Sequence, residues 1–195
     1  MKKWFIVSLL ALVVCNVKAQ SVIAEKDWTE LIGNLTKEQW QQANKLSEAY
    51  LKKIPVEAIE DTEASVLRYM YILSTSGLMN TRKFSKEEGL KKVAMFKGHK
   101  IVLPSHPITL KTGFNSVQLV DSKPDSLMIT ATNLKATEIY SFEYIIPKKP
   151  MTLEEFKNAE GKMCRVEGLL QSIKVEGSIF PRFKIFIDDA YLIIE

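Results

Sequence analysis

Three aromatic side chains with alternating spacing are the first candidates for binding chemistry. Tyr140, Phe142 and Tyr144 occupy every second position of the segment IYSFEYII. In a β-strand this spacing places all three rings on one face. Such rings can stack on sugars or on nucleobases, and each stacked base contributes about 1–3 kcal/mol. The alternative is that the rings belong to a core or to a contact with a neighbouring part of the chain, and the pattern leaves both hypotheses open.

A second candidate lies near the C-terminus, where Arg182, Lys184 and Phe186 alternate with apolar residues. The alternating partners, which we expect to form a core face, are Phe183, Ile185 and Ile187. A surface that is basic, aromatic and basic in turn suits an anionic or glycan ligand. The alternative is a solvated face on which the aromatic ring lies under the aliphatic stems of basic side chains.

Catalytic chemistry finds little support in the residue inventory. The chain has two histidines, His99 and His106, whereas a catalytic zinc site generally takes three protein ligands. It contains no GxSxG, HExxH or glycine-rich phosphate loop. Two facing carboxylates of a glycosidase would have to come from separate strands, such as those carrying Glu143 and Glu167. We therefore predict no metal, no cofactor and no catalytic residue, with a small carbohydrate-processing hydrolase as the alternative.

The first twenty residues, MKKWFIVSLLALVVCNVKAQ, have the pattern of a cleavable export signal. A basic head precedes an apolar run of about 11 residues, too short for a membrane span of roughly 20. Small side chains at Val17 and Ala19 predict cleavage after Ala19. The sequence thus predicts an exported protein, periplasmic or secreted, with no transmembrane segment. A lipid anchor at Cys15 is the alternative, although Val14 stands where a lipidation motif has a small residue.

Removal of residues 1–19 changes the charge and the cysteine content. Of the 27 basic residues, Lys2, Lys3 and Lys18 would leave with the signal, so 24 would face 23 acidic residues for a net charge of +1. A nearly neutral chain argues against nucleic acid as a partner. Cys164 would be the sole remaining cysteine, and its alternation with apolar residues predicts a small buried side chain without a disulfide.

Residues 20–95 have helical periodicity. Apolar residues at Trp28, Leu31, Ile32 and Leu35 form one stripe, and a second amphipathic helix follows to Pro55. A third helix from about residue 61 is apolar nearly all round and should lie centrally, with Gly77 and Asn80 as places for its end. We expect three or four antiparallel helices. Capping boxes are predicted at three pairs, namely Thr36 with Gln39, Ser85 with Glu88, and Thr152 with Glu155.

Residues 96–195 change to the two-residue period of strands. Candidate strands are interrupted by one short helix at 152–160, and a turn at Asp188-Asp189 separates the last two strands. Several strands, a helix and further strands resemble an OB-fold, a small Greek-key barrel of five strands with a helix between the third and fourth. The segment GKMCRVEG at 161–168, with a glycine in mid-strand, resembles a strand of such barrels. The expected fold is therefore α+β, with N-terminal antiparallel helices followed by an OB-like small antiparallel β-barrel.

Together these patterns predict a non-enzymatic binding or interaction module. Its ligand or partner, an unidentified glycan, peptide or protein, would lie on the barrel face or at the seam between helices and barrel. The residues expected at the ligand are Tyr140, Phe142, Tyr144, Arg182, Lys184 and Phe186.

Overall fold

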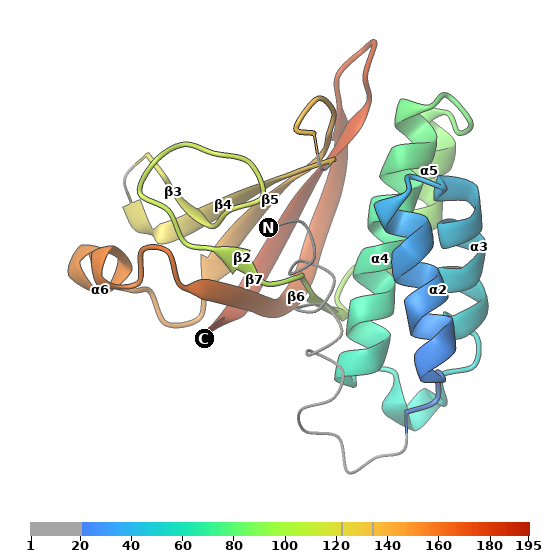
Figure 1. Ribbon diagram of the computed structural model, residues 1–195, viewed down its shortest axis with the longest axis horizontal. Coiled ribbons are helices and arrows are strands. Elements are labelled where there is room, and N and C mark those ends of the chain that lie inside the picture. Colours follow the sequence, from blue (N-terminus) through green and yellow to red (C-terminus); the bar gives the residue numbers. More distant parts are fainter. Residues whose placement is uncertain (1–20, 122, 134) are drawn as a thin grey trace.

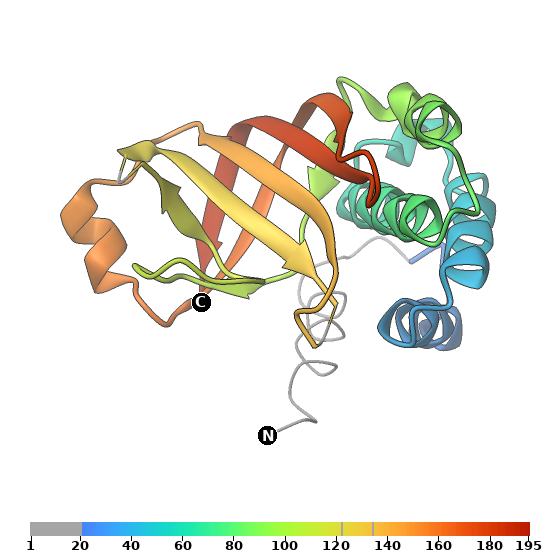
Figure 2. The same ribbon diagram turned by 90° about the horizontal axis from the view of Figure 1, so that it is seen from above.

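A computed structural model describes residues 21–195 with the exception of positions 122 and 134, and also without the side chains of 123 and 124. The expected signal, its cleavage site and Cys15 lie outside the described residues. The described chain has an α+β fold in which four helices precede a seven-stranded mixed sheet. Figures 1 and 2 show these helices grouped at one end of the sheet, with the short helix α6 at the opposite end.

The four N-terminal helices follow the apolar periodicity of the sequence. They are α2 (Glu25–Thr36), α3 (Trp40–Leu51), α4 (Thr62–Asn80) and α5 (Lys86–Val93), with 3-10 turns η1 (Val56–Ala58) and η2 (Ala94–Phe96). Helix α4 is buried along most of its length and packs against both α3 and α5. The prediction of a central, buried third helix is therefore confirmed. Its end lies at Asn80, because the helix continues without a break through Gly77.

Two of the three predicted capping boxes are present. Ser85 and Glu88 cap α5, and Thr152 and Glu155 cap α6 (Leu153–Asn158), each pair exchanging side-chain and backbone hydrogen bonds. The third prediction, at Thr36 and Gln39, is wrong. The Thr36 hydroxyl instead donates to the carbonyl of Ile32 and so belongs to the last turn of α2.

The sheet contains both antiparallel and parallel pairs. Its main path runs β1-β6-β7-β5-β4-β3, and β2 also pairs with β6. The strands are β1 (Lys100–Val102), β2 (His106–Pro107), β3 (Gln118–Val120), β4 (Lys123–Thr132), β5 (Ile139–Pro147), β6 (Met163–Glu176) and β7 (Arg182–Ile194). Helix α6 connects β5 to β6.

This sheet corrects the expectation of a small antiparallel barrel. The strand ladders do not close, since β1 and β3 lie at the two ends of the path, and β5 pairs with β7 in parallel. An isolated bridge between Ile108 and Val117 joins segments near the two ends. The sequence indicated strands with alternating faces but not their number, since β2 was missed and β7 was divided in two. Pairing between distant strands depends on contacts that a single sequence does not reveal.

The expected turn at Asp188-Asp189 is also wrong, because β7 is one continuous strand from Arg182 to Ile194. Asp189 has a φ of +50° within it, and the β6–β7 register shifts nearby. The two aspartates that resembled a turn therefore form a local distortion inside a continuous strand. Gly168 of β6 lies at one of these register shifts, where a Cβ atom would approach the Ile187 Cγ2 atom to 2.6 Å. The mid-strand glycine thus marks a bulge at which two strands pass closely.

The central helix α4 shares an apolar core with the sheet, while its other side packs with α2 and α3 in a second, helical cluster. Side chains of α4, including Tyr69 and Ile72, and Phe96 of η2 pack in the same cluster as the inner faces of β4 to β7. The inner face of β7 consists of Phe183, Ile185 and Ile187, all fully buried as the alternation predicted. The helical part and the sheet are therefore packed together rather than merely connected by the chain.

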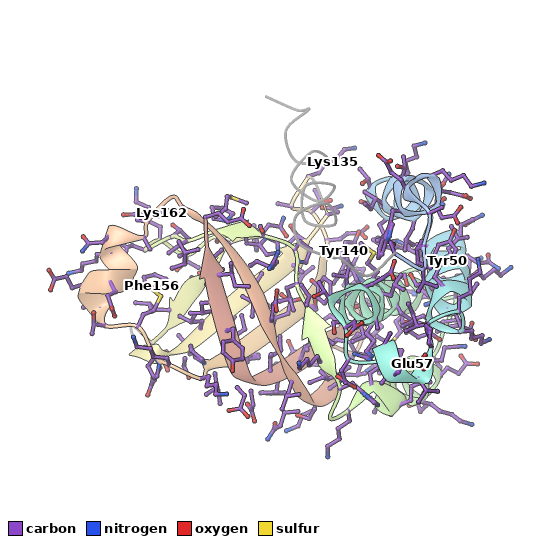
Figure 3. The ribbon with its side chains drawn as sticks, turned by 90° about the horizontal axis from the view of Figure 1, so that it is seen from below. Tyr50, Glu57, Lys135, Tyr140, Phe156 and Lys162 are labelled. Carbon is purple, nitrogen blue, oxygen red and sulfur yellow. The ribbon has the colours of Figure 1, made fainter. Side chains whose placement is uncertain are left out.

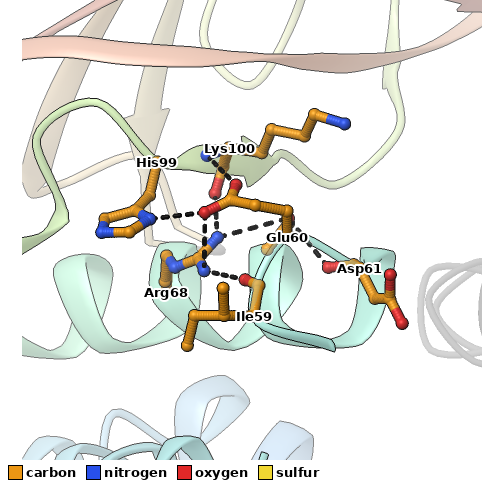
Figure 4. Close-up of polar contacts among 7 residues, drawn as sticks. Ile59, Glu60, Asp61, Arg68, His99 and Lys100 are labelled. Atoms are coloured by element: carbon orange, nitrogen blue, oxygen red, sulfur yellow. Dashed lines mark hydrogen bonds and ion pairs between the residues drawn. The ribbon is translucent and has the colours of Figure 1, made fainter. Parts of the chain in front are cut away.

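A polar clamp reinforces this junction near β1 (Figure 4). The buried guanidinium of Arg68 donates to the carbonyl oxygens of Ile59 and Lys100. Glu60 accepts from the Lys100 amide over 3.0 Å, and its other oxygen lies 2.5 Å from His99 Nδ1. Burial works to raise the pKa of Glu60, but the bonds from His99 and Lys100 and the charge of Arg68 leave that pKa lowered.

Candidate functional site

Strands β5 and β7 bring five of the six expected ligand-binding residues onto one face of the sheet. Their parallel register places Phe142 beside Lys184 and Tyr144 beside Phe186. Arg182 follows on the same face of β7, and β6 adds Lys174 and Glu176 opposite Lys184 and Arg182. We call this surface the aromatic–basic face; its residues are Phe142, Tyr144, Lys174, Glu176, Arg182, Lys184 and Phe186. Apart from Tyr140, the aromatic candidate on β5 and the basic candidate on β7 therefore form a single surface.

The rings of Tyr144 and Phe186 are stacked, with centroids 5.2 Å apart and planes inclined by 14°. Cationic groups lie over the rings of this face. Lys174 Nζ lies 5.3 Å from the Phe186 centroid, and Arg182 lies 5.0 Å from that of Phe142. Both stacked rings are half-buried. Part of the aromatic surface thus packs under basic side chains. For Phe186 of β7, this is the arrangement that the alternative hypothesis predicted.

Glu176 organises the basic side chains. Its carboxylate lies 2.7 Å from Lys184 Nζ and 3.2 Å from Arg182 Nε. The hydrogen bond from Lys184 is the main cause of a lowered pKa at Glu176, and the same bond raises the pKa of Lys184. One carboxylate thus pairs with two cations, and Lys174 is the third cationic side chain of this face.

A hollow of about 230 Å³ adjoins the stacked rings. Tyr144 and Phe186 line one part of it, and polar groups come from Ser126 of β4, Gln171 of β6 and Asp188 of β7. The hollow is smaller than the 300–1,000 Å³ of a typical small-molecule pocket. It has room for one unit of a longer ligand, with rings for a planar face and hydroxyl, amide and carboxyl groups for hydrogen bonds.

Tyr140 is the expected residue that does not join this face. It is buried, and its ring meets the indole of Trp40 edge-on at 4.8 Å. Figure 3 shows Tyr140 where the sheet meets the helices. Gly77 makes this arrangement possible, because a Cβ atom there would collide with the Trp40 indole. Tyr140 therefore packs in the seam, as the alternative hypothesis for the aromatic strand predicted.

His99 lies apart from the other two candidate ligands, whereas His106 of β2 and Cys164 of β6 are register partners. His99 lies in the polar clamp, whereas His106 is buried and its Nδ1 atom lies 3.1 Å from the carbonyl oxygen of Asn115. Over residues 21–195, apart from 122 and 134, there is no cluster of three or more metal-ligating side chains. Cys164 is fully buried, and burial raises its thiol pKa to about 11. The prediction that Cys164 is a small buried side chain is confirmed.

Glu143 is the carboxyl group with the most perturbed environment described here. It is fully buried on the inner face of β5, and burial raises its pKa to about 7. One carboxyl oxygen accepts from the Tyr69 and Ser141 hydroxyls, and the other has no hydrogen-bond partner. The glycosidase hypothesis paired Glu143 with Glu167. Glu167 instead forms an ion pair with Arg165 at 2.8 Å and is partly exposed.

Sequence reasoning missed the polar side of the hollow. Gln171 reaches it from a register shift between Leu170 and Ser172, where β6 carries one residue more than β7. Alternation along β6 gives no sign of this insertion. Ser126 belongs to the same side of the sheet only because β4 pairs with β5, which again is a matter of tertiary pairing.

Comparison with known proteins gave no relatives. A scan against protein-family models, a search of curated proteins and a search of solved structures each found no match. Among the helices of the described ranges, none combines the length and the apolar character that crossing a membrane requires. The geometry of the aromatic–basic face is therefore the basis on which a function can be assigned.

Proposed function

We propose that this protein is an exported, non-enzymatic binding module that holds a glycan on the aromatic–basic face. The observation that carries the proposal is the stacked pair Tyr144 and Phe186 beside a hollow with three polar side chains. A pyranose ring has an apolar face that lies on an aromatic ring and hydroxyl groups at its edge that bond to amides and carboxylates. The hollow accepts one such unit, so the ligand is an oligosaccharide or polysaccharide.

Binding is favoured over hydrolysis by the location of the acidic groups. A glycosidase places two carboxyl groups on opposite sides of the scissile bond, one of them with a raised pKa. The carboxyl group with the raised pKa belongs to Glu143, which is buried in the core. Among the described residues that line the hollow, Asp188 is the single acid, so the hollow lacks a facing pair of carboxyl groups. The alternative function is a small periplasmic hydrolase, which would release shorter saccharides from the ligand.

The order of elements supports a surface of this kind. From β3 onward the chain has three strands, a helix and two strands, which is the succession of an OB-fold. OB-folds bind oligosaccharides and oligonucleotides on their strands. We favour the oligosaccharide, because the chain without residues 1–19 would carry a net charge of only +1.

The test is an NMR titration of the ¹⁵N-labelled protein with soluble cello- and chito-oligosaccharides. We expect amide shifts on β5, β6 and β7 near Tyr144, Gln171 and Phe186. Substitution of either ring by alanine should weaken binding about tenfold, a loss of about 1.4 kcal/mol of binding free energy. Tyr191→Ala is the matched control, because Tyr191 is an exposed ring on β7 that does not line the hollow.

Three outcomes would contradict the proposal. The first is the absence of shifts near the hollow with every saccharide tested. The second is an equal loss of affinity in Tyr191→Ala and Tyr144→Ala. The third is release of shorter saccharides, detected by mass spectrometry, which would favour the hydrolase.

A further inference from the structure

A second concavity, at the opposite end of the sheet from the four helices, has different chemistry. This groove has a volume of about 840 Å³, within the range of small-molecule sites. Its walls are α6 on one side and the C-terminal part of β7 on the other, joined by the link from β5 to α6. Lysines 148, 149 and 162 line it, together with the apolar side chains of Met151, Leu192 and Ile194.

The walls of this groove are fixed by hydrogen bonds. The Lys148 amide donates to the Ala190 carbonyl at 2.9 Å, which continues the pairing of β5 with β7. Beyond α6, the amides of Ile108 and Gly161 donate to the carbonyls of Lys162 and Ile108, both at 2.9 Å. The helix is thus tied to the chain beside β2, and the groove is formed before any ligand arrives.

The charge in the groove is predominantly positive. Three lysines face one lining acid, Glu155, whose carboxylate accepts from the Thr152 amide at 2.7 Å in the capping box. Lys148 Nζ donates to the Tyr191 hydroxyl at 2.7 Å and lies 5.0 Å from the ring centroid, so Tyr191 positions this cation beside the groove. Figure 3 shows Lys162 beside α6 at the same end of the molecule. An anionic group is the complement of this arrangement.

We infer that the groove binds a small anionic amphiphile, a molecule with an apolar chain and one carboxylate or phosphate head. Leu192 and Ile194 are partly exposed along the groove, and Met151 adds a flexible apolar wall. A chain lying on these side chains would remove apolar surface from water, while the lysines neutralise the head.

Isothermal titration calorimetry with monomeric dodecyl phosphate, kept below its micelle concentration, tests the inference. We expect saturable binding of one molecule per chain. Inorganic phosphate and dodecyltrimethylammonium should each bind at least tenfold more weakly, because the first lacks the chain and the second has the opposite charge. Two variants probe the groove: Lys149→Gln with Lys162→Gln together, and Ile194→Ser alone. Each should weaken binding of dodecyl phosphate about tenfold or more.

The matched control combines Lys26→Gln and Lys157→Gln, which remove the same charge from α2 and from α6 outside the groove. It should bind like the unchanged protein. Equal affinity for the cationic amphiphile, or equal losses in the control and the groove variants, would overturn the inference. So would sedimentation with phosphatidylglycerol vesicles in the absence of monomer binding, which would indicate a membrane surface. None of these three results affects the glycan proposal, whose residues lie on β4 to β7 around Tyr144.

Discussion

The Tyr69 hydroxyl of α4 donates a hydrogen bond of 3.1 Å to the buried carboxyl of Glu143 on β5. This contact joins the central helix to the inner face of the sheet. The carboxyl group of Glu143 is fully buried at this contact, and its burial raises its pKa to about 7. At neutral pH the fold therefore holds a carboxyl group that is close to its own titration point.

Glu143→Gln should change how stability depends on pH. Between pH 4.5 and 7 the unfolded chain releases this proton while the folded chain keeps it, so the free energy of unfolding falls as pH rises. A shift of this size corresponds to about 3 kcal/mol. Urea denaturation should show the variant near wild type at pH 4 and more stable at pH 8, by up to that amount. Parallel profiles for the two proteins would mean that Glu143 titrates normally.

His106→Gln should reveal the opposite slope. Burial lowers the pKa of His106 from 6.5 to about 4, so the folded chain holds it neutral while the unfolded chain binds a proton below pH 6.5. Its contribution of about 3 kcal/mol is present above pH 6.5 and is lost as pH falls toward 4. In the wild type this slope offsets that of Glu143 between pH 4.5 and 6.5. The variant should therefore lose stability more steeply as pH rises; a profile that stays as flat as wild type would contradict this.

Gly168→Ala should destabilise the protein by about 1–3 kcal/mol, because the added methyl group would meet Ile187 at 2.6 Å and the Asp188 carbonyl oxygen at 2.9 Å. The matched control is Gly33→Ala in α2, where a Cβ atom has no neighbour within 4 Å. Alanine favours the helix there and should stabilise it by up to about 1 kcal/mol. Thermal unfolding of the two variants compares them. Equal effects would show that β6 and β7 separate easily at the bulge.

Cys164→Ser should cost about 1–3 kcal/mol, since a hydroxyl would replace a thiol in a fully buried apolar site. Cys164→Ala separates the two causes, because alanine removes the sulfur without introducing a polar group. We expect serine to be the less stable of the two in chemical denaturation. A serine variant as stable as wild type would place residue 164 in contact with water.

Local patterns in the sequence determined the helices, two of the three capping boxes and the core face of β7. These features depend on residues within a few positions of one another, such as Ser85 with Glu88 or the alternation through Ile185. The burial of Cys164 followed from the same alternation. The sequence also placed Phe142 with Tyr144, and Lys184 with Phe186, on single strand faces.

Tertiary structure decided which of those faces lie together and what covers them. The parallel pairing of β5 with β7 put Tyr144 against Phe186, although more than forty positions separate them in the sequence. Packing against Trp40 removed Tyr140 from the same face, and the orientation of β5 turned Glu143 into the core. Alternation along a strand specifies two faces, but only the contacts of the folded chain determine which neighbour each face meets.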